Sequence, residues 1–437
     1  MAGLVFLIFF VLLALGYPII MCMIGGAVTP LAMDAVGATS IAALIRGAFS
    51  GANSPNILCL PLFIFAGVLM AEGGISKKLF DVFAYFVGNK TGGMPCAVII
   101  TCLFYGAISS SGAATAAAIG AMTIPLLIEL GYDAKFAAAT VAVSGGLGVI
   151  IPPSGPFMMY GMATETSIGA LFMAGILPGI LVACLLMFYA VTYCKIHGED
   201  KAKIQSNYQK IAAAGFLPLL KDSFWALLSP VIILGGIYAG IVTPTEAAAV
   251  SVFYALFVSL FIYKTVSFQK LPELLRSAVK SAAPICFLLA FATAFGRTLS
   301  LIHAADIVQN AIMTIATDKI SFLIVVIIAF FLLGMVMDTG PALIILGPIL
   351  CPIAESYGID PVHLGVLMVC NLAVGLVTPP FGLNLFNMDV DFLGGVTMTY
   401  DLGQQADTAE VENLAKGVLE GKLSSVTTSG STGRSLQ

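Results

Sequence analysis

Long apolar runs dominate this chain, and short polar segments separate them. A helix needs about 20 apolar residues to cross the hydrocarbon core of a bilayer. Strands of a membrane β-barrel are shorter and alternate in polarity, which these runs do not. The pattern therefore predicts an all-α polytopic membrane protein. The clearest runs are Leu4–Thr29, Met94–Ser109, Phe136–Ile151, Ile168–Cys194, Phe224–Ile241, Ala247–Tyr263, Ile320–Met337 and His363–Thr378.

The composition supports the same class. Of the 437 residues, 59% are hydrophobic and only 10% are charged, whereas a soluble domain carries about 25% charged residues. We find no sequence motif of a known catalytic site and no histidine or cysteine spacing typical of a metal site. We therefore expect neither an enzyme nor a bound cofactor. The lipid bilayer is the expected surrounding, and we do not expect the protein to bind nucleic acid.

A double proline recurs in the same local frame. Gly148–Gly155 reads GVIIPPSG and Gly375–Gly382 reads GLVTPPFG, an offset of 227 residues (379 − 152 = 227). The register extends upstream, where Gly120 and Pro125 match Gly347 and Pro352. Paired helix-breaking motifs in the two halves of a membrane protein indicate a binding site. The chain is therefore predicted to contain two repeats.

The double prolines are themselves candidate ligands for a cation. Proline removes a backbone donor and leaves a carbonyl unpaired, and a buried carbonyl needs a partner such as a bound ion. Pro152, Pro379 and Thr378 are candidate Na⁺ ligands on this ground, and Ser154 adds a hydroxyl for substrate. The alternative is a plain loop at the bilayer surface.

A polar break also recurs at this register. The first repeat reads Ser109-Ser110-Ser111-Gly112, and the second reads Asp338-Thr339-Gly340. An unwound helix at membrane depth offers carbonyls and hydroxyls to Na⁺ and a helix N-terminus to an anion. An acid inside the membrane is by default a functional hypothesis. The alternatives are a small-residue packing face for the serines and a helix cap in a surface loop for Asp338.

Two further breaks interrupt apolar stretches, at Gly51–Asn56 and Ser281–Pro284. Their flanking helices have only about 12–16 apolar residues, which is short for a crossing. We predict re-entrant hairpins whose tips carry the Na⁺ candidates Asn53, Ser54 and Ser281. Two short ordinary spans with an exposed turn are the alternative. Arg297, beyond the second break, could meet a carboxylate or extend its charge to the membrane surface.

Lysine placement predicts opposite orientations for the repeats. The loops 195–222 and 264–280 are lysine-rich and are separated by two spans, so the positive-inside rule places both in the cytoplasm. Loop 72–90 of the first repeat carries three lysines, but the matching stretch, about 304–318, has two aspartates and no lysine or arginine. We divide the chain into residues 1–40 (scaffold helix), 41–195 (repeat 1), 196–263 (loop and helical hairpin), 264–386 (repeat 2) and 387–437 (acidic tail).

Three segments together resemble a known family. Gly240–Val250 reads GIVTPTEAAAV, Leu376–Phe386 reads LVTPPFGLNLF and Pro61–Gly67 reads PLFIFAG. These are similar to the large (DctM-like) membrane subunit of tripartite ATP-independent periplasmic (TRAP) transporters, from about residue 1 to Phe386. After Phe386 the family continues with one more apolar helix, whereas this chain continues with an acidic tail and a stretch rich in serine, threonine and glycine, Ser424–Ser435.

The resemblance implies a Na⁺-coupled importer of organic acids (C4-dicarboxylates, other carboxylates or sialic acids) in the bacterial inner membrane. It implies an elevator movement and two partners, a small membrane subunit (DctQ-like) and a periplasmic substrate-binding protein (DctP-like). The predicted substrate contacts are Ser110, Ser154, Asp338 and Arg297. The predicted Na⁺ contacts are Asn53, Ser54, Ser109, Ser111, Gly112, Pro152, Ser281, Thr339, Gly340, Thr378 and Pro379. A stand-alone carboxylate carrier, a polar-lined channel and a truncated homologue without activity remain as alternatives.

Overall fold

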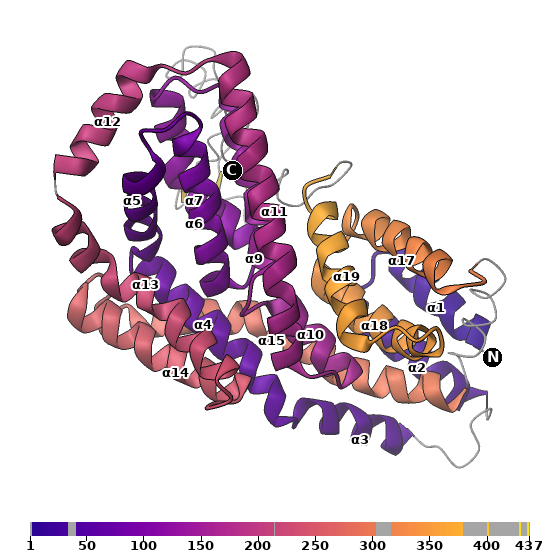
Figure 1. Ribbon diagram of the computed structural model, residues 1–437. Coiled ribbons are helices and arrows are strands. Elements are labelled where there is room, and N and C mark those ends of the chain that lie inside the picture. Colours follow the sequence, from indigo (N-terminus) through magenta and orange to yellow (C-terminus); the bar gives the residue numbers. More distant parts are fainter. Residues whose placement is uncertain are drawn as a thin grey trace.

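The computed structural model describes residues 2–33, 41–213, 215–302 and 316–378, and three two-residue strands beyond them (Figure 1). Its main segments are helical, which confirms the predicted class, and seven helices are long and apolar enough to cross a membrane. The helices of the first part are α1 (Ala2–Ala14), α2 (Ile19–Ala32), α3 (Ile41–Ala52), η1 (Pro55–Leu58), α4 (Cys59–Glu72), α5 (Ile75–Val87), α6 (Gly93–Ser109), α7 (Gly112–Glu129), α8 (Ala134–Gly145), α9 (Leu147–Ile150), α10 (Gly155–Thr164) and α11 (Ile168–His197).

The second part contains the linker helices and the second repeat. Its helices are α12 (Lys201–Ala213), α13 (Phe216–Tyr238), α14 (Pro244–Phe257), the π-helical turn η2 (Val258–Ile262), α15 (Leu271–Leu301), α17 (Lys319–Gly334), α18 (Thr339–Ser356) and α19 (Pro361–Gly375). The strands β1 (Tyr400–Asp401), β2 (Thr428–Ser429) and β3 (Ser435–Leu436) pair antiparallel in the order β1-β3-β2.

The helices of the two repeats coincide at the offset found in the sequence. Helices α7 and α18 begin at Gly112 and Thr339 and end at Glu129 and Ser356, each pair 227 residues apart. Helices α8 and α19 likewise begin at Ala134 and Pro361. The residues that cap these helices correspond too, because an aspartate caps both α8 and α19 with its side chain. The two repeats therefore share the same register in their helix boundaries as well as in their amino-acid sequence.

Each repeat contains one contact between the backbones of two glycines. A Cβ added to Gly106 of α6 would lie 2.5 Å from the Cα of Gly148 in α9. In the second repeat a Cβ on Gly375 would lie 2.5 Å from the Cα of Gly334 in α17. Since real side chains cannot approach so closely, glycine is required at these crossings. The segment before each double proline is thereby held against the helix that leads into the polar turn.

Two expected breaks behave differently. The first is present, because the chain bends by 55° between Leu44–Ala52 and Asn56–Glu72, where Ser54 before Pro55 is extended. The bend is far from the reversal that a hairpin needs. The second expectation is wrong, since Ser281–Pro284 lies inside the continuous helix α15. Ser281 hydrogen-bonds the Ser277 carbonyl of its own helix, and membrane helices tolerate an internal proline such as Pro284.

The expectation of one N-terminal span is also wrong. The run Leu4–Thr29 forms two helices of 13 and 14 residues, α1 and α2, which pack against each other. Gly16 has a left-handed φ of 81° and Pro18 precedes α2. This pair ends one helix and starts the next, as Gly and Pro commonly do.

Two groups of helices are joined along one edge (Figure 1). One group contains α5–α8 and α11–α13, and the other contains α1, α2 and α17–α19, with α15 running beneath both beside α3 and α4. Helix α10 of the first repeat leaves its own group and packs between α18 and α19 of the second. There Tyr160 donates a hydrogen bond to the Pro361 carbonyl at 2.8 Å. The packing of α10 against α18 and α19 brings the two repeats together at the polar turns.

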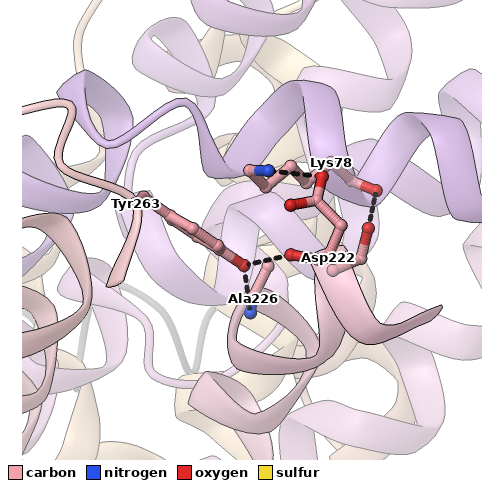
Figure 2. Close-up of polar contacts among 5 residues, drawn as sticks. Lys78, Asp222, Ala226 and Tyr263 are labelled. Carbon is pink, nitrogen blue, oxygen red and sulfur yellow. Dashed lines mark hydrogen bonds and ion pairs between the residues drawn. The ribbon is translucent and has the colours of Figure 1, made fainter. Parts of the chain in front are cut away.

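A polar network fixes α13 to α5 at the face that carries the lysine-rich loops (Figure 2). Lys78 of α5 pairs with Asp222 of α13 at 2.5 Å and lies 4.4 Å from the centre of the Tyr263 ring. The Tyr263 hydroxyl donates to the Asp222 carbonyl and accepts from the Ala226 amide. The Tyr263 hydroxyl thus connects α13 to the segment that follows η2.

Candidate functional site

A cavity of about 370 Å³ lies where the polar turns of the two repeats meet. That volume is within the usual range for small-molecule sites. Helices α4, α6, α7, α9, α10, α15 and α18 contribute walls. The lining residues are Leu60, Ile64, Gly67, Val68, Ala71, Tyr105, Ser109, Ser110, Ser111, Gly112, Ala113, Ala114, Val149, Gly155, Pro156, Met159, Ser281, Ile285, Asp338, Thr339 and Leu376.

Equivalent positions of the two repeats line this cavity together. Ser111 and Asp338 are 227 residues apart, as are Gly112 and Thr339, and all four line it. Val149 and Leu376 form a third equivalent pair and share a small buried cluster. The cavity therefore lies at the junction of the repeats, where a site made from paired broken helices is expected.

In the first repeat, a two-residue turn joins α6 to α7, which pack against each other. Ser110 takes the left-handed conformation, with φ 55°. Ser111 caps α7 by accepting a hydrogen bond from the Ala114 amide, and the hydroxyls of Ser109 and Thr115 lie 2.6 Å apart. The cap is uncharged, so the partial positive charge of the α7 N-terminus is not neutralised by it.

The N-terminus of α7 leaves two amides free. Those of Gly112 and Ala113 have no hydrogen-bond partner among the residues that the structure describes, and both residues line the cavity. The first amides of a helix always lack an internal partner. Here they are available to an acceptor in the cavity, and together with the dipole they favour an anion.

In the second repeat, an acid occupies the equivalent position. Asp338 caps α18, and its Oδ1 accepts from the Thr339 amide at 2.7 Å and from the Thr339 hydroxyl at 3.4 Å. Its Oδ2 accepts no hydrogen bond from any described residue. The Asp338 side chain is exposed at the cavity, while Thr339 is buried. This end of the cavity therefore presents a carboxylate oxygen that can bind a cation.

The first double proline is tied to the serine turn. The Ser110 hydroxyl donates to the Pro153 carbonyl at 2.7 Å. Ser154 is fully buried, donates to the Val149 carbonyl and caps α10 by accepting from the Phe157 amide. The Ser110 hydroxyl thus joins the serine turn to the double proline, and the Ser154 hydroxyl joins α9 to the start of α10. Gly155 and Pro156, which follow, form part of the cavity wall.

Of the predicted contacts, the structure brings Ser109, Ser110, Ser111, Gly112, Ser281, Asp338 and Thr339 to one cavity. Gly340 is buried beside it, where a Cβ would lie 2.7 Å from the sulfur of Met159. Thr378 bonds the Val374 carbonyl of its own helix, and Pro379 lies outside the described residues. Pro152 lies in the segment that ends at Ser154, just before the wall residues Gly155 and Pro156.

Three predicted residues lie elsewhere. Asn53 and Ser54 are at the bend before α4 and do not line the cavity, and Arg297 is an exposed residue of α15 with no ion-pair partner in the described part of the chain. Sequence reasoning missed Tyr105 and Met159, both from apolar helices. Tyr105 lies one turn before the serine turn, a spacing that could have indicated it.

Among the described residues, no group of three or more His, Cys, Asp or Glu side chains could hold a metal ion. The polar atoms at the cavity are hydroxyls, amides and the Asp338 carboxylate. Oxygen donors of this kind suit a hard cation rather than a transition metal.

Comparison with known proteins gives consistent matches. Residues 6–390 match the family described as tripartite ATP-independent periplasmic transporter, DctM component. The isethionate TRAP transporter permease protein DctMQ of Oleidesulfovibrio alaskensis is 42% identical over 352 residues, which cover 80% of this chain and 55% of that relative's length. The C4-dicarboxylate TRAP transporter large permease protein of Pseudomonas aeruginosa is 36% identical, over 79% of this chain and 80% of its own.

The fold has a counterpart among solved structures. The crystal structure of the YdaH transporter of Alcanivorax borkumensis aligns with a TM-score of 0.55 at 16% identity, covering 81% of this chain and 82% of that one. At this identity the likeness concerns the fold alone. It agrees with a multi-pass helical membrane protein.

Proposed function

Because this chain belongs to the DctM component family of tripartite ATP-independent periplasmic transporters, we propose that it is the permease subunit of a Na⁺-coupled importer of small organic acids. Relatives are named for C4-dicarboxylate, sialic acid and isethionate. All three substrates are organic anions. The observation that carries the proposal is one cavity with a free helix N-terminus on one side and a carboxylate on the other.

The substrate anion binds at the N-terminus of α7. The free amides of Gly112 and Ala113 donate to a carboxylate or sulfonate oxygen, and the hydroxyls of Ser109 and Ser111 add polar contacts. The anion interacts favourably with the unneutralised α7 dipole. At this membrane depth such an interaction is stronger than in water because the surroundings are less polar.

Na⁺ binds at the second repeat. The free Oδ2 of Asp338 supplies a charged ligand, and the hydroxyl of Thr339 lies beside it. A bound Na⁺ offsets the cost of holding a carboxylate at membrane depth and lowers the repulsion between Asp338 and the substrate anion. Binding of either ion therefore favours binding of the other, which is the thermodynamic basis of coupling.

The proposed machinery includes two partners and a moving part. A periplasmic binding protein captures the acid, and a small membrane subunit supports the permease in the bacterial inner membrane. One relative, named DctMQ, is longer than this chain, which spans 55% of its length. We place the moving part at the two repeats around the cavity, with α10 joining them, and propose that they travel together as an elevator.

The test is uptake of labelled isethionate, succinate and sialic acid into proteoliposomes that contain the full chain and its small subunit. Each acid is offered with and without its binding protein and an inward Na⁺ gradient. We expect uptake of at least one acid to need both. Uptake with Na⁺ but without the binding protein would replace this proposal with a stand-alone carrier, and Na⁺-independent passive flux would indicate a channel.

A further inference from the structure

A second cavity, of about 470 Å³, lies between α8 and α11, away from the polar turns. Helix α8 supplies one wall, with Phe136, Ala139 and Val143, and helix α11 supplies the other, with Leu186, Tyr189 and Tyr193. Ile99 of α6 also lines this groove, and Asp133 and Lys135 line it near the start of α8. We call this cavity the α8–α11 groove.

The α8 wall of the groove presents no unpaired hydroxyl. Its only hydroxyls on α8 belong to Thr140 and Ser144, and each donates to a carbonyl of its own helix, at 2.7 and 2.6 Å. Phe136 and Val143 of α8 are seven residues apart, which corresponds to a rise of about 10 Å. The α8 wall therefore needs no further polar partner over a length that fits about half of an acyl chain, while α11 adds the tyrosine hydroxyls of Tyr189 and Tyr193.

Both charges of the groove lie at one end. Asp133 caps α8 through Oδ2, which accepts from the Phe136 amide, and its Oδ1 has no partner among the described residues. Lys135 is exposed and forms no ion pair with any residue that the structure describes. The two groups, two residues apart in the sequence, therefore offer one carboxylate oxygen and one ammonium group at the groove mouth.

This mouth is at the level where the chain leaves the membrane. Tyr132 donates to Glu199 at 2.6 Å, and Glu199 lies just beyond the end of α11, in the lysine-rich loop. Near this contact, the Tyr193 ring stacks on two others. Its centre lies 4.1 Å from that of Phe136 and 4.0 Å from that of His197. Aromatic rings at this depth are typical of the interface between lipid headgroups and acyl chains.

We propose that the α8–α11 groove binds a zwitterionic phospholipid of the phosphatidylethanolamine type. The Lys135 ammonium group contacts the lipid phosphate, the Asp133 carboxylate contacts the lipid ammonium group, and one acyl chain lies along Ala139 and Leu186, the accessible part of the two walls. Complementarity favours this lipid over an anionic one, since Asp133 and Lys135 line the mouth with one charge of each sign and Glu199, bonded to Tyr132, adds a further negative charge close by. Exposed apolar side chains on α11, among them Leu185 and Phe188, place the groove on the lipid-facing side.

The test is native mass spectrometry of the full chain, alone and co-expressed with its small membrane subunit, after exchange into detergent with equal phosphatidylethanolamine and phosphatidylglycerol. We expect one phosphatidylethanolamine to be retained per chain. Lys135→Gln and the groove-filling Ala139→Trp should each lower the retained fraction at least fivefold. The matched controls are Lys203→Gln, an exposed lysine of the same face, and Ala121→Trp, an exposed alanine of α7.

Three outcomes would overturn the proposal. Equal loss in the control variants would mean that the retained lipid is not bound in the groove. Preferential retention of phosphatidylglycerol would refute the paired-charge headgroup site. Lipid retained by the chain alone but displaced when the small subunit is present would make the groove a subunit interface. None of these outcomes depends on transport activity, so the inference can fail independently of the proposed function.

Discussion

The two repeats share one backbone plan and differ in the chemistry at its centre. In each, a glycine before the double proline contacts the backbone of a glycine in the helix that precedes the polar turn. In each, the residue before the next helix caps it, but Ser111 does so with a hydroxyl and Asp338 with a carboxylate. The difference makes one end of the cavity favourable to an anion and the other favourable to a cation. Duplication alone would have produced two similar sites.

A second difference lies in the segments that lead into the repeats. The segment Leu44–Glu72 is bent by 55°, while its equivalent, Leu271–Leu299, is straight enough to form one helix. The first contains Asn53, Ser54 and Pro55, which favour a turn, and the second has Ala282 and Ala283 before Pro284, which favour a helix. The shared register therefore does not require a shared shape, because single residues decide whether a helix continues.

The largest loss of stability and uptake should come from disrupting the glycine contact that both repeats share. Gly106→Ala places a Cβ 2.5 Å from the Cα of Gly148, and Gly375→Ala places a Cβ 2.5 Å from the Cα of Gly334. Overpacking of this kind costs about 1–3 kcal/mol, so both variants should lower the thermal unfolding temperature and reduce uptake strongly. Gly235→Ala is the matched control, since nothing lies within 4 Å of its Cβ position. A stable Gly375→Ala beside an unstable Gly106→Ala would show that the repeats do not depend equally on this contact.

The next effect concerns the charge difference. Asp338→Asn removes the anionic ligand and should raise the half-saturating Na⁺ concentration about tenfold, equivalent to about 1.4 kcal/mol. Ser111→Asp places a carboxylate against the proposed anion site and should raise the half-saturating substrate concentration by a similar factor. Uptake measured against Na⁺ and against substrate separates the two. If Asp338→Asn altered only substrate affinity, the assignment of the cation to the second repeat would be wrong.

A smaller effect is expected at the link between the serine turn and the double proline. Ser110→Ala leaves the Pro153 carbonyl without its donor, which should cost about 1 kcal/mol of stability and weaken substrate binding by positioning α7 less firmly. Ser110→Gly also removes the hydroxyl but relieves the left-handed backbone. The thermal unfolding temperature should therefore be highest for the wild type, lower for the Gly variant and lowest for the Ala variant. The half-saturating substrate concentration should rise in the same order. Wild-type behaviour of both would show that the hydrogen bond is dispensable.

The smallest effect lies far from the cavity, in the network of Figure 2. Lys78→Met removes the ion pair with Asp222 and the contact with the Tyr263 ring. Because Asp222 is well exposed, the loss should be at most about 1 kcal/mol of stability, with Na⁺ and substrate dependence unchanged. Lys203→Met, at the weaker pair with Asp200, provides the comparison. A change in half-saturating Na⁺ for Lys78→Met would connect this face to the ion site.

Much of the candidate site could be predicted because its residues interrupt apolar runs. Ser109–Gly112 and Asp338–Thr339 are polar where the membrane demands apolar residues, and the repeat pairs them. Ser154 shows the limit of this reasoning. Its hydroxyl is buried and holds its own backbone, which no sequence pattern distinguishes from a hydroxyl that faces a ligand. Met159 was missed because an apolar helix residue at a cavity resembles any other in the sequence, whereas Tyr105 was missed although it lies one turn before the serine turn.

By itself the sequence determined the helical membrane class, the repeat with its register, and the positions of the polar turns. These follow from local quantities, namely hydropathy, helix-breaking residues and capping side chains, which act within a few residues of each other. Only the tertiary structure decided that α15 stays continuous, that α10 packs into the opposite repeat, and that Ser111 and Asp338 share one cavity. Such contacts join segments hundreds of residues apart. They depend on close packing at small residues such as Gly340 and Gly365, whose partners no local pattern specifies.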